Sequence, residues 1–170
     1  MSTVLTTDRL LIKEFQRKDA AFVLELVNTP AWLKYIGDRA VYNLSDAENY
    51  VNDRLMAAYK THGFGMYAVW HKEHNIAIGM CGLVQRDYLE YPDLGFAFLS
   101  AFTRKGYAFE ASQAVLLFAQ QQLKLEQLYA FTLPENLSSI KLLEKLDFQY
   151  QKDFQIPNDS DHLSLYWKGT

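Results

Sequence analysis

The sequence predicts an α+β protein with a mixed sheet. Segments rich in β-formers at 64–70 and 76–84 are joined by a short polar stretch, which predicts an antiparallel hairpin. An apolar strand at 93–99, a helical stripe at 107–123 and a strand at 128–133 predict a β-α-β unit. With the remaining elements the order is β, α, α, β, β, β, α, β, α, β, β.

The N-terminal third predicts one strand and two helices. Residues 9–15 alternate in polarity, as a half-buried strand does. Residues 18–27 carry apolar side chains at helical spacing, and Pro30 stops this helix. A second helix at 45–62 begins with a Ser-x-x-Glu capping box at Ser45. A connector rich in aromatic residues joins the two helices.

The rest of the chain completes the sheet. Because residues 93–99 are nearly all apolar, we expect a central strand covered on both faces. Pro134 and Asn136 open a short helix with an apolar face, and two last strands flank the turn at 157–160.

Composition and charge limit the class of protein. The 170 residues show no linker or repeat, which predicts a single domain spanning 1–170. Seventeen Lys and Arg against twenty Asp and Glu argue against a nucleic-acid partner. The distribution of apolar and charged residues shows neither a secretory signal nor an apolar stretch long enough to span a membrane. We therefore expect no membrane partner. Because the lone cysteine, Cys81, offers no internal disulfide, we expect a cytoplasmic protein.

The segment at 103–108 carries the strongest chemical signal. A buried strand runs through a short loop into a long helix, whose N-terminus presents unpaired N–H groups and partial positive charge. Gly106 lets an anion approach closely, and Arg104 and Lys105 add two charges. The loop is therefore either a phosphate site or a solvated basic loop with a helix-start glycine.

Two motifs establish a family resemblance. Residues 103–108 match the pyrophosphate-loop pattern Q/R-x-x-G-x-G/A at Gly106 and Ala108, with Thr103 at the first position. Residues 134–148 match N-x-x-S-x-x-L-L-E-K-L-G-F, with Asp147 in place of the glycine. The chain thus resembles the GNAT superfamily of N-acetyltransferases, in the branch that includes the ribosomal-protein N-terminal acetyltransferases. Further matches at 7–10, 79–83 and 93–96 extend the resemblance over nearly the whole chain.

The resemblance implies a fold and a co-substrate. The fold is the GNAT-type acyl-CoA N-acyltransferase fold: three α/β/α layers around a mixed seven-stranded sheet whose central strands, at 93–99 and 128–133, splay apart. The co-substrate is acetyl-CoA. The implied CoA-binding residues are Phe98 and Leu99 at the splayed edge, the loop residues Arg104, Lys105, Gly106, Tyr107 and Ala108, and Asn136 beside the pantetheine arm. Asn136 is equally suited to be a helix N-cap.

Acetyl transfer to an amine also needs a proton acceptor and an outlet for the CoA thiolate. Asp93, at the start of a central strand, is the first candidate for general base or amine anchor, ahead of Glu90 and Asp87. Many superfamily members place a tyrosine as general acid where this chain has Leu143. Ser139 is therefore the expected hydrogen-bond donor to the thiolate.

The connector between the first two helices is the expected wall of the acceptor site. Loops supply binding residues disproportionately, and this one offers rings and charges suited to an amine or a carboxylate. Packing of the connector over the sheet edge is the alternative. The candidate residues are Trp32, Tyr35, Asp38 and Arg39.

Other sites are not expected. His71 and His74 lie in the predicted hairpin turn without further metal ligands, so we expect a solvated turn and no metal. Cys81 lies inside an apolar strand, which favours a core residue over a nucleophile. The glycines at 63–65 precede a strand and not a helix, so NAD is not implied.

The sequence thus predicts an acetyl-CoA-dependent N-acetyltransferase. Its acceptor is a primary amine of a peptide N-terminus or of a small molecule, such as the substrate of a detoxifying transferase. The alternative is a non-catalytic acyl-CoA-binding or regulatory module on the same fold. We expect a monomer or a homodimer.

Overall fold

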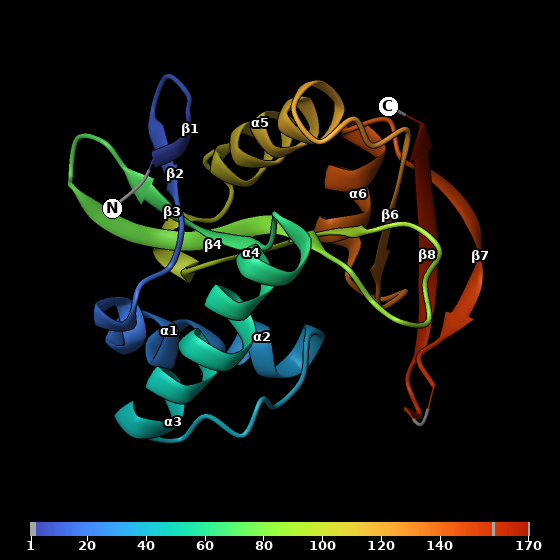
Figure 1. The fold of residues 1–170 in the computed structure, drawn as a ribbon. Helices are drawn as coiled ribbons and strands as arrows, with labels where there is room; N and C mark the ends of the chain where they lie inside the picture. The colour runs from blue at the N-terminus through green and yellow to red at the C-terminus, as the bar shows by residue number, and fades with distance from the viewer. Residues whose placement is uncertain (1–2, 158, 170) are drawn as a thin grey trace.

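The computed structural model describes residues 3–157 and 159–169 and has three layers (Figure 1). A single mixed sheet forms the middle layer. Helices α1 to α4 cover one face of it, and helices α5 and α6 cover the other. The α+β class and the α/β/α layering expected from the sequence are confirmed.

The sheet of the described residues has eight strands in the order β1-β2-β3-β4-β5-β6-β8-β7. All neighbours pair antiparallel except β5 and β6, which are parallel. The strands are β1 (Thr3–Thr6), β2 (Leu10–Lys13), β3 (Met66–His71), β4 (Ile76–Val84), β5 (Asp93–Phe98), β6 (Gln127–Thr132), β7 (Gln149–Gln155) and β8 (His162–Gly169).

One strand more is present than the seven that the sequence predicts. The additional strand is β1, which lies at the edge of the sheet and, among the described strands, pairs with β2 alone. It has four residues, none of them fully buried, so it carries no polarity pattern that would mark it in the sequence. The predicted central position of the strand that begins at Asp93 is confirmed.

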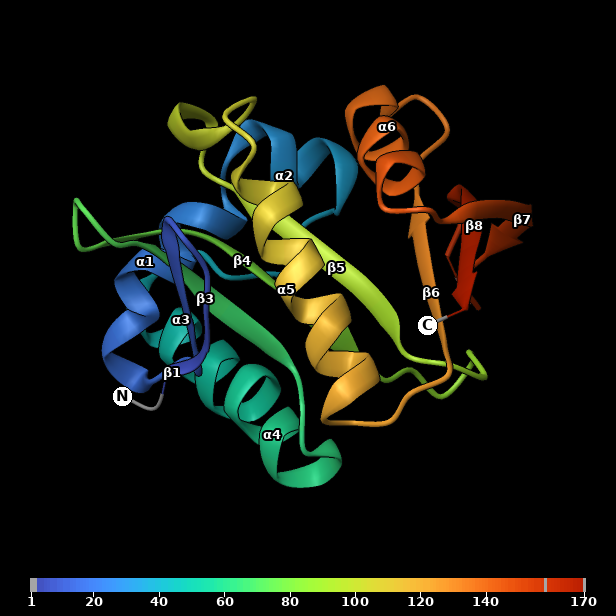
Figure 2. The ribbon, with the colours of Figure 1, turned by 90° about the horizontal axis from the view of Figure 1, so that it is seen from above.

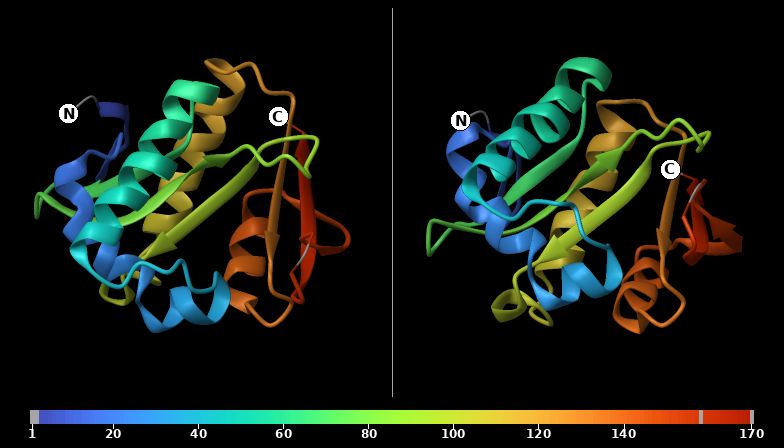
Figure 3. Two further views of the ribbon diagram at one scale, coloured as in Figure 1. Left: turned by 60° about the horizontal axis from the view of Figure 1, so that its bottom comes forward. Right: turned by 90° about the horizontal axis from the view of Figure 1, so that it is seen from below.

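The layer below the sheet in Figure 1, here called the lower layer, faces the viewer in Figure 3. It consists of helices α1 (Ala20–Val27), α2 (Pro30–Tyr35), α3 (Leu44–Tyr50) and α4 (Ala57–His62). The sequence analysis expected a connector without a helix after α1, and this was wrong in part. The connector contains helix α2, which begins at Pro30. The fixed φ angle and missing N–H of Pro30 suit the first turn. The side chain of Thr29 caps this helix by accepting from the N–H of Trp32.

The predicted capping box at Ser45 was also wrong. Helix α3 begins one residue earlier, and its N-cap is Asn43, whose side-chain oxygen accepts from the N–H of Asp46 at 3.0 Å. Asp46 in turn accepts from the N–H of Tyr42 at 2.9 Å. A π-helical segment at Val51–Met56 joins α3 to α4, so the predicted helix is continuous to His62.

The upper layer consists of α5 (Tyr107–Gln121) and α6 (Leu137–Lys145) (Figure 2). Helix α5 connects β5 to the parallel strand β6, so the predicted β-α-β unit is confirmed. After α6 the chain passes through Asp147 with φ +64°. The family pattern has glycine here because the position requires a left-handed backbone, which aspartate adopts more readily than most residues.

Two apolar cores lie on opposite faces of the sheet. One, under α5 and α6, includes Leu128, Val115 and Leu143. The other, against α1 and α3, includes Val23, Leu26 and Val51. Successive residues of β5 contribute to different cores: Phe96 and Phe98 pack toward α5, whereas Ala97 packs toward α1 and α3.

Candidate active site

The parallel strands β5 and β6 separate soon after they begin. Their one register pair among the described residues is Asp93 with Tyr129, supported by a hydrogen bond from the Tyr129 N–H to the Pro92 carbonyl at 2.9 Å. Beyond this point the two strands diverge toward their carboxyl ends (Figures 2 and 3). Ligands of open α/β sheets bind outside the carboxyl ends of neighbouring parallel strands. The divergence therefore marks the candidate site.

Backbone N–H groups of β5 point into this divergence. The N–H of Leu99 donates to the Ile78 carbonyl of β4 at 2.9 Å. Because alternate residues of an antiparallel pair bond the same neighbour, the N–H groups of Phe96 and Phe98 point the other way, toward β6. The N–H of Leu99, which the sequence analysis placed at the splayed edge with Phe98, is therefore bonded to β4. The N–H of Phe96, a residue that the sequence analysis did not name, points toward β6 as that of Phe98 does.

Residues 103–108, here called the anion loop, connect the carboxyl end of β5 to α5. Gly106 is the N-cap of α5 with φ +83°, and Arg104 also has a positive φ of 59°. The loop thus turns sharply, and the first N–H groups of α5, from Tyr107 and Ala108, have no preceding helical turn to bond. Arg104 and Lys105 are exposed. The predicted combination of glycine, two cations and a helix N-terminus is present.

Thr103, where the family pattern has Gln or Arg, serves the loop itself. Its hydroxyl donates to the Ser100 carbonyl at 2.8 Å, closing the short helix at Ser100–Phe102. This bond explains why a small hydroxyl residue is suited to this position.

The side chain of Tyr107 is buried, so only its backbone can meet a ligand of the loop. Its hydroxyl lies 2.9 Å from Nε2 of His71. Because Nδ1 of His71 accepts from the N–H of His74, Nε2 carries the proton and donates to Tyr107. The expected solvated turn was therefore wrong for His71, which is the buried last residue of β3.

Asn136 follows β6 and caps α6. Its side-chain oxygen accepts from the N–H of Ser139 at 3.3 Å, so the predicted N-cap is confirmed. Ser139 itself is half-buried in the first turn of this helix. Leu143 is buried in the core under α5 and α6, so this position holds no acid.

Asp93 is buried, with 3% of its surface exposed, and it is paired with Arg86. Nε of Arg86 donates to Oδ1 at 2.6 Å and Nη2 donates to Oδ2 at 3.3 Å. Burial raises the pKa of the Asp93 carboxyl, while the charge and hydrogen bonds of Arg86 oppose this rise. Asp93 is thus at the start of the strand, as predicted, but the sequence did not reveal its partner.

Arg86 is surrounded by aromatic side chains. Its Cζ lies 4.8 Å from the ring centroid of Phe131 on β6, and Nη1 donates to the Tyr88 hydroxyl at 3.1 Å. Burial raises the pKa of Tyr50 on α3, and the positive charges of Arg39, Arg54 and Arg86 oppose that shift. An arginine-rich region thus lies on the α1 to α4 side of the site.

The four residues predicted to wall an acceptor site do not form one cluster. Trp32 is buried in the core against α1 and α3, as expected from the packing alternative. Asp38 holds its own loop, accepting from the Tyr42 hydroxyl and the Ala40 N–H, both at 2.7 Å. Arg39 lines a cavity of about 240 Å³ together with Tyr50 and Arg54. The ring of Tyr35 lies 4.9 Å from Nζ of Lys34.

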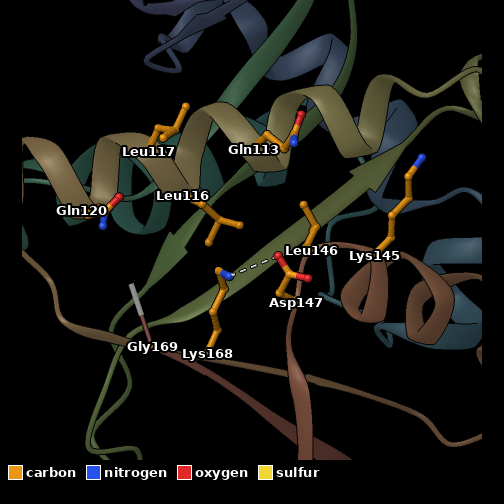
Figure 4. A pocket seen from close by; sticks show the side chains of 9 residues that line it. All are labelled: Gln113, Leu116, Leu117, Gln120, Lys145, Leu146, Asp147, Lys168 and Gly169. Carbon is orange, nitrogen blue, oxygen red and sulfur yellow. Dashed lines mark ion pairs between the residues drawn. The ribbon is translucent and has the colours of Figure 1, made fainter.

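A larger cavity of about 390 Å³ lies between α5, the end of α6 and the end of β8 (Figure 4). Lys168 and Asp147 form an ion pair at 3.8 Å across it. None of the candidate site residues lines this cavity. Its lining residues are Gln113, Leu116, Leu117, Gln120, Lys145, Leu146, Asp147, Lys168 and Gly169.

Other chemistry finds little support. Cys81 is fully buried, and burial raises the pKa of its thiol to about 12, so the predicted core role is confirmed. Within residues 3–157 and 159–169, no three or more His, Cys, Asp or Glu side chains are grouped to hold a metal ion. In the same ranges, every helix is too short or too polar to cross a bilayer.

Comparison with known proteins identifies the family. The family described as "Acetyltransferase (GNAT) domain" matches residues 9–149. The uncharacterized N-acetyltransferase YnaD of Bacillus subtilis (strain 168) is 28% identical over 165 residues, which cover 96% of this chain and 94% of YnaD.

Solved structures agree in fold. An acetyltransferase of the GNAT family from Bacillus anthracis is 28% identical with a TM-score of 0.81, covering 97% of each chain. RimL, a ribosomal L7/L12 alpha-N-protein acetyltransferase in complex with coenzyme A, is 13% identical with a TM-score of 0.83 over 99% of this chain and 98% of that one. The diverging strands, the anion loop and the family match together show that the chain belongs to the GNAT superfamily and is an acetyltransferase.

Proposed function

We propose that this acetyltransferase uses acetyl-CoA and transfers the acetyl group directly to a primary amine of a peptide N-terminus or a small molecule. One observation carries the proposal: β5 and β6 diverge next to the N-terminus of α5, so backbone donors and a cationic loop lie at the same end of the sheet. Acetyl-CoA has a thioester carbonyl at one end and a pyrophosphate further along the molecule. The carbonyl suits the backbone donors of β5, and the pyrophosphate suits the cationic loop.

The residues present fit CoA. The pyrophosphate would lie at the anion loop, on the first N–H groups of α5 and near Arg104 and Lys105. The pantetheine arm would follow the divergence of β5 and β6, into which the N–H groups of Phe96 and Phe98 point and where the described residues of the two strands pair only at Asp93 and Tyr129. Asn136 would lie beside that arm and still cap α6. RimL, which shares the fold, was solved in complex with coenzyme A, which supports CoA as the ligand class.

Transfer needs no covalent enzyme intermediate. The lone pair of an uncharged amine attacks the thioester carbon, the C–N bond forms, and the C–S bond breaks with its electron pair leaving on sulfur. N–H groups fixed along β5 would stabilise the negative charge that develops on the carbonyl oxygen. A free thiol has a pKa of about 8.5, so the thiolate leaves with hydrogen-bonding help alone, which we assign to Ser139.

The amine must also lose a proton. We assign this role to Asp93, which side-chain alternation places on the α1 to α4 face of β5. Its two oxygens carry hydrogen bonds from Arg86, but a carboxylate has about four acceptor sites and can receive a further N–H. Glu90 and Asp87, in the loop before β5, are the next candidates.

The acceptor would approach from the α1 to α4 face, opposite the helices that flank CoA. Tyr50, Arg39 and Arg54 lie on this side, and the half-buried Tyr35 belongs to the same layer. RimL, a structural neighbour, is a ribosomal L7/L12 alpha-N-protein acetyltransferase, which favours a peptide or protein amine as acceptor. We further propose that residues 1–170 form one domain that acts in the cytoplasm as a monomer or homodimer.

A pair of glycine variants tests the CoA site. Gly106→Val puts a β-branched side chain on a left-handed residue beside the anion, and a Cβ there would already lie 3.2 Å from Nη2 of Arg9. Gly63→Val is the matched control, since Gly63 has φ +76° and open space around its Cβ position. Calorimetry should show loss of acetyl-CoA binding in the first variant only. Equal affinities in two folded variants would contradict the site.

Activity is tested by thiol release from acetyl-CoA over a panel of amines, with mass detection of the products. A peptide and a small-molecule arm are run together, because both acceptors remain within the proposal. Acetylated product with stoichiometric CoA release supports direct transfer. Tight acetyl-CoA binding without turnover of any amine would instead favour a binding module.

A further inference from the structure

The turn between β1 and β2 reaches across the molecule to the anion loop. Arg9 on this turn donates from Nη1 to the carbonyl oxygen of Lys105 at 3.0 Å. From Nε it donates to Oε2 of Glu110, on the first turn of α5, at 2.7 Å. The N-terminal hairpin is thus tied to a segment about a hundred residues later in the chain.

Glu110 is fully engaged by this turn. Its second oxygen, Oε1, accepts from the Thr7 hydroxyl at 2.6 Å and from the backbone N–H of Arg9 at 2.9 Å. Burial raises the pKa of Glu110, but the hydrogen bonds from Thr7 and Arg9 outweigh burial and hold it below its usual value. The carboxylate is therefore charged at neutral pH and is matched by one guanidinium.

The planar face of the Arg9 guanidinium also packs on an aromatic ring. Its Cζ lies 4.4 Å from the ring centroid of Tyr107, whose hydroxyl is fixed by His71. A guanidinium held by two hydrogen bonds and a ring has few orientations left. It can therefore act as a rigid support for the loop.

The contact with Lys105 determines where the next N–H points. In a trans peptide the carbonyl and the N–H point in opposite directions, and the chain has no cis peptide bond among the described residues. Because Arg9 holds the Lys105 carbonyl, the N–H of Gly106 is directed away from Arg9. The left-handed φ of Gly106 then leads the chain into α5.

The charge of Glu110 gives Arg9 a second effect. A carboxylate in the first turn of α5 stabilises the helix but repels any anion bound at the same N-terminus. Arg9 cancels this charge, which leaves Arg104 and Lys105 as the loop cations without a carboxylate partner among the described residues. Both effects favour an anion at the loop.

We propose that Arg9 is a positioning residue for CoA: it orients the Lys105–Gly106 peptide and neutralises Glu110, so that the anion loop accepts the pyrophosphate. The inference rests on the proposed use of CoA. It adds a requirement that the loop motif itself does not contain, namely a cation supplied by the β1–β2 turn.

The test compares CoA with pantetheine, which lacks the pyrophosphate, as ligands of the wild type and of Arg9→Met. Calorimetry and ligand-observed NMR give the two affinities. Loss of a charged hydrogen-bonding support should weaken CoA binding by about 10- to 100-fold and leave pantetheine binding unchanged. Arg17→Met, which removes an exposed arginine bonded to Asn52 on the lower layer, is the matched control.

Two further variants keep the test decisive if Arg9→Met folds poorly. Arg9→Lys retains the positive charge but lacks the planar guanidinium that bonds Glu110 and the Lys105 carbonyl at once. This variant should bind CoA with intermediate affinity. Arg9→Met with Glu110→Gln removes both charges, and should recover part of the CoA affinity lost in Arg9→Met. Absence of that recovery would overturn the charge-neutralising role.

The outcomes separate this inference from the function on which it rests. Equal weakening of CoA and pantetheine in Arg9→Met would indicate a general structural defect and overturn the inference. Wild-type-like preference for CoA in Arg9→Met would overturn it too, while the CoA site stands. If the wild type binds CoA no better than pantetheine, the proposed CoA loop itself fails, and the inference with it.

Discussion

Arg86 binds Asp93 through two nitrogens, so the residue that we propose as general base also belongs to a buried ion pair of the fold. Asp93 begins β5 and forms with Tyr129 the one register pair between β5 and β6 among the described residues, so its carboxylate is buried at the closed end of the strand divergence. Arg86 makes that burial tolerable, since removing one partner of a buried ion pair leaves an uncompensated charge. A variant at either residue therefore has to be assayed for folding and for turnover.

Asp93→Asn should lower kcat/KM by about 10²- to 10⁴-fold if the carboxylate takes the amine proton. Acetyl-CoA affinity should change little, because Asp93 lies away from the anion loop. The pH profile distinguishes its two roles. Loss of a base removes the acidic limb of kcat/KM, whereas loss of an amine anchor mainly raises the acceptor KM.

A double variant separates chemistry from stability at this pair. Asp93→Leu with Arg86→Met removes both charges and should recover part of the stability lost in Asp93→Leu alone. We expect turnover to stay low in the double variant. If turnover returns along with the melting temperature, the carboxylate has no chemical role, and Glu90 and Asp87 become the candidates.

Asn136→Ala should weaken acetyl-CoA binding by more than the loss of a helix cap explains. The cap alone contributes about 1 kcal/mol to stability. Asn43→Ala is the matched control, because Asn43 caps α3 through the same type of side-chain bond. Melting temperatures and calorimetry are measured for both variants. Wild-type acetyl-CoA affinity in Asn136→Ala would reduce Asn136 to a cap.

Asp147→Gly should stabilise the fold. Asp147 has φ +64°, which costs a residue with a Cβ about 1 kcal/mol relative to glycine, and its ion pair with Lys168 is 3.8 Å long with the carboxylate largely exposed. A gain of this size raises Tm by about 2–4 °C. Asp147→Ala keeps the backbone cost and should not raise Tm. A lower Tm for Asp147→Gly would show that the ion pair outweighs the backbone term.

Glu110 should make stability fall in acid. Its pKa is lowered in the folded state, so its contribution is fully present above the pKa of an unfolded glutamate, about 4.3, and is lost as the pH falls through the lower folded value. Urea unfolding at pH 7, 5, 4 and 3 should show the wild type and Glu110→Gln converging toward low pH. Glu48→Gln, at an exposed position of α3, is the control. A constant difference at all four pH values would contradict the linkage.

Local patterns predicted much of this fold. The strand at Ile76–Val84, the β-α-β unit and the Asn136 cap follow from polarity period and short-range capping, which depend on neighbours in the chain. The anion loop was predictable for the same reason, because its glycine, cations and helix start are contiguous.

Long-range partners were not predictable from one sequence. Nothing near Glu110 in the sequence indicates that Arg9 will bind it, and the exposed strand β1 lacks the apolar alternation that marks a strand. The cap of α3 was missed because two overlapping signals occur, Asn43 with Asp46 and Ser45 with Glu48, and the structure uses the first. The direction of the Leu99 N–H likewise depends on register with β4, which becomes visible only when the strands are paired.

The divergence of β5 from β6 also bears on how the protein unfolds. It leaves β6, β8 and β7 as a three-stranded unit that, in the part of the chain the structure describes, pairs with the rest of the sheet at one register position. Such a unit can open below the free energy of global unfolding, exposing its amides to exchange with deuterated solvent. A co-substrate that contacts both β5 and β6 would stabilise this unit against local opening. We therefore expect the ligand to slow amide exchange in β6 and β8 and to leave exchange in β3 and β4 unchanged. That result would show that the bound co-substrate links the two parts of the sheet.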